Sequence, residues 1–207
     1  TFGDRVALVA PNSVWHVLTF LAAARLGAIF VPANPQFTEG ELAYVLSNCA
    51  PRLVLGPPAE VEALTRAAGA TQASVLAFDD ALLHGEALFA NAAATSDPCL
   101  IIYTSGTTGF PKGAMHSHAS FIAAGEAFVE RMHLQESDRL LLVLPMFHIN
   151  AMFYSVAGAF AAGATLLIEE RFSASQFWNR VVDLRATQAN LIEAAISILL
   201  ARPEAEF

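Results

Sequence analysis

The chain of 207 residues has few cations: lysine and arginine total 11, against 19 aspartate and glutamate residues, for a formal net charge of −8. Nucleic-acid binding requires a basic face, so this composition argues against it. An anionic ligand would have to be held by local N–H groups and single cations, because the net charge repels it.

Cysteine is also scarce. Only Cys49 and Cys99 occur, and neither has the spacing of a metal ligand set. We expect both to be reduced, packed thiols of a cytoplasmic protein, and we predict no metal-binding residue. No charged segment followed by an apolar core opens the chain, so we expect no secretory signal.

Charged residues are missing from residues 140–168, a stretch long enough to cross a bilayer. A proline, a histidine and an asparagine interrupt its first half, and two glycines interrupt its second half. This pattern favours two strands around one buried helix over a transmembrane segment.

Short apolar runs alternate with helical stretches along the chain, which predicts an α/β fold of mostly parallel sheets covered by helices. Asp97-Pro98 is a candidate boundary between two α/β halves, residues 1–97 and 98–207. Strands are expected at 6–10, 28–31, 52–55, 75–78, 100–103, 139–144, 165–169 and 188–192. Helices are expected at 13–26, 38–47, 59–68, 117–132, 151–162, 173–184 and 194–201.

Local signals fix some of these helices more closely. Thr38-Glu-Gly-Glu41 and Ser173-Ala-Ser-Gln176 both have the pattern of a capping box. In the first helix, Val14, Val17, Leu18 and Leu21 form one apolar face, and Gly27 is expected to end it.

The most informative run follows the predicted strand Leu100–Tyr103. Glycines allow positive φ and close backbone approach to a ligand, hydroxyls add donors, and a lysine adds a compact charge. The run contains all three kinds: Thr104, Ser105, Gly106, Thr107, Thr108, Gly109 and Lys112. It predicts a polyphosphate-binding loop rather than a bland surface turn.

The run differs from the common phosphate loop, in which Gly, four residues and Gly-Lys-Ser/Thr open a helix. Here Pro111 and Gly113 flank Lys112 and keep the segment a loop. A kinase or another NTPase remains an alternative, although no acidic magnesium motif follows Leu144.

Thr104–Gly113 closely resembles the signature loop of the adenylate-forming superfamily, whose members are acyl-CoA synthetases, luciferases and peptide-synthetase adenylation domains. Arg5–Ser13, Leu26–Pro35 and Leu144–Ile149 resemble further N-terminal landmarks of that family, in the same order. The resemblance implies that the chain is part of the large N-terminal domain of such an enzyme.

It also implies ATP-dependent activation of a carboxylic acid as an acyl-adenylate, followed by thioester formation with CoA. Thr104, Ser105, Thr107 and Lys112 match phosphate-contacting positions of the family, with Mg²⁺ bridging the phosphates. The implied partners are therefore a small carboxylic acid, ATP and CoA. A carrier-protein thiol as acceptor, a non-enzymatic nucleotide-binding remnant and a homo-oligomer stay open.

Without the resemblance, a lone histidine such as His148 is more often a packed core or loop residue than a site residue. The resemblance makes it a catalytic candidate with Lys112, because the family has an aromatic-His pair here that orients the acyl carboxylate. His148–Tyr154 and Arg171–Trp178 resemble the carnitine- and crotonobetaine-CoA ligase branch. The apolar side chains of 152–154 and Phe160 fit an acyl pocket and a plain core equally well.

Family segments that supply a magnesium-linked glutamate, a ribose-binding aspartate and a small C-terminal domain with a catalytic lysine do not occur in these residues. We therefore expect a fragment that does not complete adenylation by itself.

Overall fold

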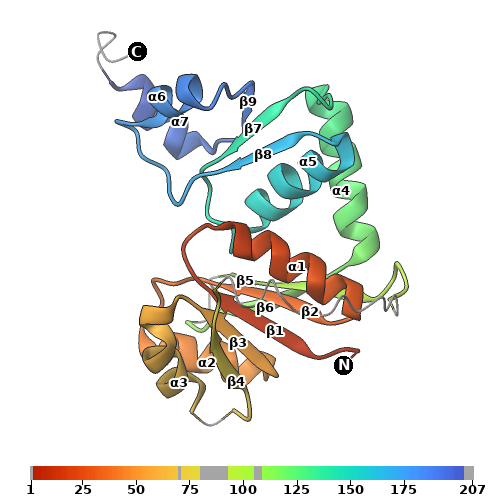
Figure 1. The fold of residues 1–207 in the computed structure, drawn as a ribbon, viewed down its shortest axis with the longest axis vertical. Coiled ribbons are helices and arrows are strands. Elements are labelled where there is room, and N and C mark those ends of the chain that lie inside the picture. The colour runs from red at the N-terminus through yellow and green to blue at the C-terminus, as the bar shows by residue number, and fades with distance from the viewer. Residues whose placement is uncertain (1, 70, 80–92, 105–108, 203–207) are drawn as a thin grey trace. The chain divides into compact units, whose positions relative to one another are not determined.

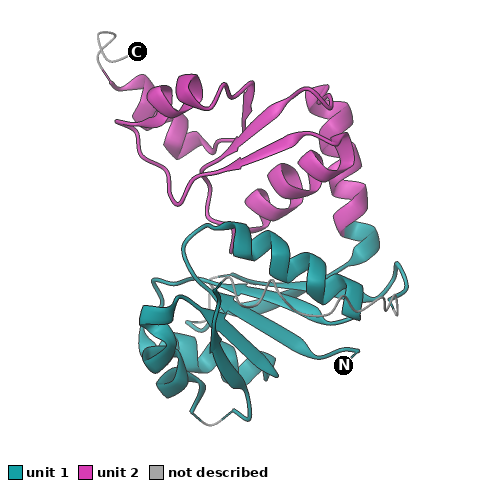
Figure 2. Ribbon diagram, in the orientation of Figure 1, with its two compact units in different colours: residues 1–120 teal, residues 121–207 magenta. Residues whose placement is uncertain are grey.

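A computed structural model describes residues 2–69, 71–79, 93–104 and 109–202. The chain divides into two compact units, residues 1–120 and 121–207, and each is described by itself (Figures 1 and 2). The boundary proposed at 97/98 lies elsewhere in the structure, because the strand that begins at Pro98 pairs within the sheet of the first unit.

Six strands make up the sheet of the first unit, counted over the residues that are described, in the order β4-β3-β1-β2-β5-β6. All neighbours are parallel except β5 and β6. The strands are β1 (Arg5–Val9), β2 (Ile29–Ala33), β3 (Leu53–Gly56), β4 (Ser74–Ala77), β5 (Pro98–Thr104) and β6 (Lys112–Ser117). The helices are α1 (Val14–Leu26), α2 (Glu39–Cys49), the 3₁₀ turn η1 (Pro58–Glu60) and α3 (Val61–Ala68).

Helices cover both faces of this sheet, as Figure 1 shows. α2 and α3 bury Leu42, Val45 and Leu64 against the face that carries Val31 and Ile101. α1 lies on the other face, where Phe20 contacts Phe30 with ring centroids 6.1 Å apart. The predicted α/β architecture with a mostly parallel sheet is confirmed.

The apolar face expected for α1 is not the face that is buried. The helix buries His16, Thr19, Phe20 and Ala23, whereas Val14, Leu18 and Leu21 are exposed. α1 carries apolar residues on nearly all sides, so its sequence does not determine which stripe meets the sheet.

The two predicted capping boxes have opposite outcomes. The Thr38 hydroxyl accepts a bond from the Glu41 amide (3.3 Å), and the Glu41 carboxylate accepts one from the Thr38 amide (2.8 Å). The second box is wrong, because α6 (Phe177–Asp183) begins after Gln176 without a side-chain cap. The Ser173 hydroxyl instead lies 3.3 Å from that of Ser175.

The second unit holds a parallel sheet in the order β8-β7-β9, flanked by helices. One cluster packs around Leu141 and Phe177, and another packs around Leu140 and Ala159. The strands are β7 (Arg139–Leu142), β8 (Thr165–Ile168) and β9 (Gln188–Ala189). The helices besides α6 are η3 (Ala151–Val156), α5 (Ala157–Ala162) and α7 (Glu193–Leu200), while α4 (His118–Met132) begins in the first unit.

The uncharged segment 140–168 forms β7, η3, α5 and β8 rather than one helix. η3 is a π-helix of 6 residues, which the sequence did not predict. None of the helices in the described part of the chain has the length and apolarity needed to cross a membrane.

Gly125 of α4 lies where a side chain would meet backbone. A Cβ there would sit 2.6 Å from the carbonyl oxygen of Ala157, at the start of α5. A helical Gly→Ala change normally stabilises by about 1 kcal/mol. For Gly125→Ala we expect the opposite sign, a loss of about 1–3 kcal/mol in the unfolding free energy of the second unit, because the helices must separate.

Urea unfolding followed by Trp178 fluorescence, with Trp15 replaced by phenylalanine, reports on the second unit, since the chain has two tryptophans. Gly40→Ala in α2 of the first unit is the matched control, followed by Trp15 fluorescence with Trp178 replaced by phenylalanine, because no atom outside the backbone of its own helix lies within 4 Å of a Cβ at Gly40. Equal stabilisation by both changes would contradict the close contact of α4 with α5.

Candidate functional site

The candidate phosphate site is built on the β5–β6 hairpin. β5 is buried from Cys99 to Tyr103 and becomes exposed at Thr104, its last residue. Lys112 begins β6 and pairs directly with Thr104 in the antiparallel register. The structure thus brings the first and the last of the predicted phosphate-contacting residues side by side, both exposed to solvent.

Glycine is needed at both described ends of this region. Gly109 has φ +105°, a conformation that an L-residue rarely adopts. Gly113 lies opposite Tyr103, and a Cβ there would sit 3.1 Å from the Cζ atom of that ring. The absence of a side chain at Gly113 allows the Tyr103 ring to lie across β6.

Four of the predicted loop residues, Ser105, Gly106, Thr107 and Thr108, lie outside the described residues. Strand β6 is a finding that the sequence missed. The proline and glycine around Lys112 indicate a loop, but the pairing with the buried β5 extends the backbone from Lys112 onward.

His148 lies in the second unit, in the turn that follows β7. Its amide donates to the Pro145 carbonyl (3.0 Å), and its own carbonyl accepts from the Met152 amide (3.4 Å) at the start of η3. The residue is partly covered, and its ring lies 4.5 Å from the Phe147 ring, centroid to centroid. Partial burial lowers the pKa of His148, so the imidazole is neutral at physiological pH.

The strands that precede the phosphate loop and His148 belong to different sheets. β5 belongs to the first sheet and β7 to the second.

Side-chain contacts of Asn190, which the sequence did not predict, hold the turn that carries His148; they are called the Asn190 clasp below. Asn190, directly after β9, donates from Nδ2 to Oδ1 of Asn150 and lies 3.5 Å from the buried hydroxyl of Ser155. The sequence signal that could have identified Asn190 is its position as a polar residue at the carboxyl end of a parallel strand.

The apolar side chains near His148 divide into two groups. Met152 and Phe153 are buried, whereas Tyr154 and Phe160 are exposed. The Tyr154 ring stacks on Phe128 of α4 with centroids 5.4 Å apart.

A shallow hollow lies at the carboxyl ends of β7 and β8. Its charged lining is largely paired within the protein, since Arg180 donates to Glu169 at 2.7 Å. Over the described ranges, no group of three or more His, Cys, Asp or Glu side chains is placed to hold a metal ion.

The first unit is an α/β protein whose parallel sheet ends, at the β5–β6 hairpin, in an exposed hydroxyl residue and an exposed lysine. A family model described as AMP-binding enzyme matches residues 1–207. The chain therefore belongs to the AMP-binding enzyme family, which confirms the resemblance found in the sequence.

Curated relatives include the long-chain-fatty-acid–CoA ligase FadD13 of Mycobacterium tuberculosis, which is 35% identical over 213 residues, covering 98% of this chain and 42% of that protein. The crotonobetaine/carnitine–CoA ligase of Shigella sonnei is 30% identical over 219 residues, covering 97% of this chain and 42% of that protein. The similarity to the carnitine branch is thereby confirmed.

Among solved structures, ATP-bound MatB from Rhodopseudomonas palustris matches with a TM-score of 0.90 and 26% identity, over 98% of this chain and 42% of that one. The chain thus spans less than half the length of the relatives that it matches.

Proposed function

We propose that the native protein is an AMP-forming acid–CoA ligase. A carboxylate oxygen attacks the α-phosphorus of ATP and expels pyrophosphate, and the CoA thiol then displaces AMP from the acyl carbon and loses its proton. The relatives named as CoA ligases support this reaction class. The observation that carries the proposal is the pairing of Thr104 with Lys112 at the end of the β5–β6 hairpin. This pair lies in a chain that matches the AMP-binding enzyme family.

In this proposal Lys112 neutralises phosphate charge as pyrophosphate departs, and Thr104 donates its hydroxyl to a phosphate oxygen. The solved relative with ATP bound supports a nucleotide site in this fold. Ser105, Gly106, Thr107, Thr108 and Gly109 are predicted from the sequence to bind the phosphates as well, through backbone N–H groups and hydroxyls. Magnesium is expected to bridge the phosphates of ATP, as the resemblance to the family implies, because phosphate oxygens are ligands that Mg²⁺ prefers.

We propose that His148 orients the acyl carboxylate in its neutral form. Its lowered pKa fits a hydrogen-bonding role better than that of a permanent cation. The Asn190 clasp, through its hydrogen bond to Asn150, would keep the turn that carries His148 in one conformation.

The acceptor and the compartment belong to the same proposal. CoA is favoured over a carrier-protein thiol because the named relatives are CoA ligases. We propose a cytoplasmic enzyme whose buried Cys49 and Cys99 stay reduced, since burial raises the pKa of each thiol to about 11.

The test is acid-dependent ATP–pyrophosphate exchange by the full-length native protein against a panel of fatty, aromatic and betaine-type acids. AMP release with and without CoA then separates a ligase from an enzyme that serves a carrier protein. Pyrophosphate exchange that requires an acid, with AMP release stimulated by CoA, is expected. ATP hydrolysis independent of any acid would instead indicate an NTPase.

A further inference from the structure

Both arms of the phosphate-site hairpin contact one helix, α2, at positions one turn apart. Tyr103 precedes Thr104 at the end of β5, and Phe110 precedes Lys112 at the start of β6. Their partners are Asn48 and Tyr44, respectively. Residues four apart lie on the same side of a helix, so α2 presents both partners together.

The first arm is held by a buried phenol. Tyr103 is 6% exposed, and its hydroxyl donates to Oδ1 of Asn48 at 2.5 Å. The ring also lies across Gly113 of β6. A buried hydroxyl without a partner is costly, so this bond fixes where β5 ends relative to α2.

The second arm is held by a ring stack. Phe110 follows Gly109 and is 59% exposed, yet its ring lies 4.5 Å from the Tyr44 ring, centroid to centroid, at an interplanar angle of 27°. Such a stack contributes beyond the apolar area it covers. An exposed phenylalanine beside a ligand loop thus has a defined position.

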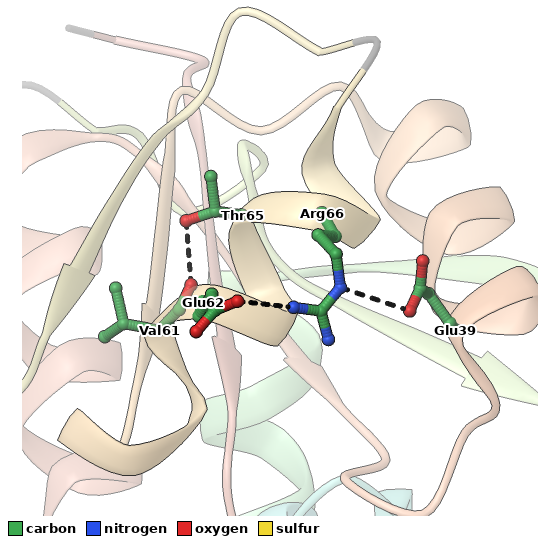
Figure 3. A network of polar contacts seen from close by, with 5 residues as sticks. All are labelled: Glu39, Val61, Glu62, Thr65 and Arg66. Carbon is green, nitrogen blue, oxygen red and sulfur yellow. Dashed lines mark hydrogen bonds and ion pairs between the residues drawn. The ribbon is translucent and has the colours of Figure 1, made fainter.

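α2 is itself fixed at both ends. Arg5 of β1 donates from Nε to the Cys49 carbonyl (2.6 Å) and from a terminal nitrogen to the Ala50 carbonyl. These bonds provide partners for carbonyl groups at the C-terminal end of α2. At the N-terminus, Glu39 lies 3.6 Å from Nε of Arg66 on α3, which also pairs with Glu62 (Figure 3). These last pairs are exposed and contribute little energy, so the packed apolar face of α2 and Arg5 supply most of its anchoring.

We propose that Tyr44 and Asn48 are positioning residues for the nucleotide-phosphate site, acting through Phe110 and Tyr103 to hold the ends of the hairpin in the ligand-binding geometry. The inference rests on the proposed function, because it concerns the site that binds the phosphates of ATP. Fixing both arms in advance reduces the conformational entropy lost when the nucleotide binds.

The experiment measures KM for ATP and KM for the acid in the full-length native protein. Tyr44→Leu and Phe110→Leu should each raise KM for ATP by about two- to tenfold, the worth of one aromatic pair, with KM for the acid unchanged. The double variant should be no worse than either single one, because both remove the same stack. Phe110→Tyr keeps a ring and should stay close to the unsubstituted protein.

Trp15→Leu is the matched control. It removes another stack of the first unit, Trp15 on Phe78 with centroids 5.3 Å apart, whose residues lie outside the hairpin. Phe110→Leu keeps the test decisive if Tyr44→Leu does not fold, because Phe110 lies largely in solvent.

Four results overturn the inference. If Tyr44→Leu and Phe110→Leu have the same KM for ATP as Trp15→Leu, the stack does not position the site. Additive effects of the two changes in the double variant would show the same. An equal rise in both KM values would show a general structural loss. Absence of acid-dependent exchange in the unsubstituted protein would overturn the proposed function as well, and it is distinguishable from the other three results because they concern variants of an active protein.

Discussion

Replacing Lys112 by alanine is expected to lower acid-dependent ATP–pyrophosphate exchange in the full-length protein by about 100-fold, the usual cost of removing one positioned charge-stabilising donor. Lys112 pairs with Thr104 at the hairpin end, where the proposed function places the phosphates of ATP. It is exposed, so the same change should leave the unfolding free energy within about 0.5 kcal/mol.

Two variants distinguish the effect of the Lys112 charge from an effect of the overall net charge. Lys112→Arg keeps a cation but replaces a compact ammonium by a wide planar group, so exchange should recover only in part. Arg52→Ala removes a cation whose side chain is 75% exposed in the same unit and should leave exchange unchanged. Full exchange by Lys112→Ala would contradict the assigned role.

Lys112 also offers a binding readout that needs no turnover. It is the sole lysine among the 207 residues, the other ten cations being arginine. Acetylation of this one ε-amine, followed in the Lys112 peptide by mass spectrometry, should slow when MgATP is added and stay constant when adenosine is added.

Features encoded by neighbouring residues were predictable. Thr38 and Glu41 form the expected capping box because both partners lie within one turn. Gly27 ends α1 at φ +68°, which its lack of a side chain allows. The strand before Thr104 followed from its unbroken apolar run.

Features that depend on distant packing were not predictable. The buried stripe of α1 is chosen by the sheet, which takes His16 and Thr19 in place of Val14 and Leu18. β6 exists because β5 offers an unpaired edge, although its own sequence resembles a loop. The same limit applies to the site: its hydroxyls and lysine are consecutive in sequence, but the contacts to Tyr44 and Asn48 become visible only in the folded chain.

His16 is expected to make the first unit sensitive to mild acid. The side chain is 0% exposed, its Nδ1 atom lies 3.4 Å from the Ser13 hydroxyl, and its Nε2 atom has no hydrogen-bond partner among the residues described. The ring meets Phe30 edge-on, with centroids 6.4 Å apart. Burial therefore lowers the pKa of His16 to about 4, which keeps the ring neutral in the folded protein.

Because an unfolded histidine titrates near pH 6.5, the unfolded state binds the proton first as pH falls. The stabilising effect of the neutral ring is complete above about pH 6.5 and is lost between there and about pH 4. By pH 5 the unfolding free energy of the first unit should have dropped by about 2 kcal/mol from this group alone.

Trp15 is adjacent to His16 on α1, so its fluorescence in a Trp178→Phe background reports unfolding of the first unit. Urea titrations from pH 7.5 to 5 should give a stability that declines with acid, and His16→Leu should remove most of that decline while other groups titrate as before. Thr19→Val, at a second buried polar residue of α1 that carries no titrating group, serves as the control and should keep the full slope. The same slope in His16→Leu would mean that the acid sensitivity arises elsewhere, because leucine cannot take up the proton that drives the predicted loss.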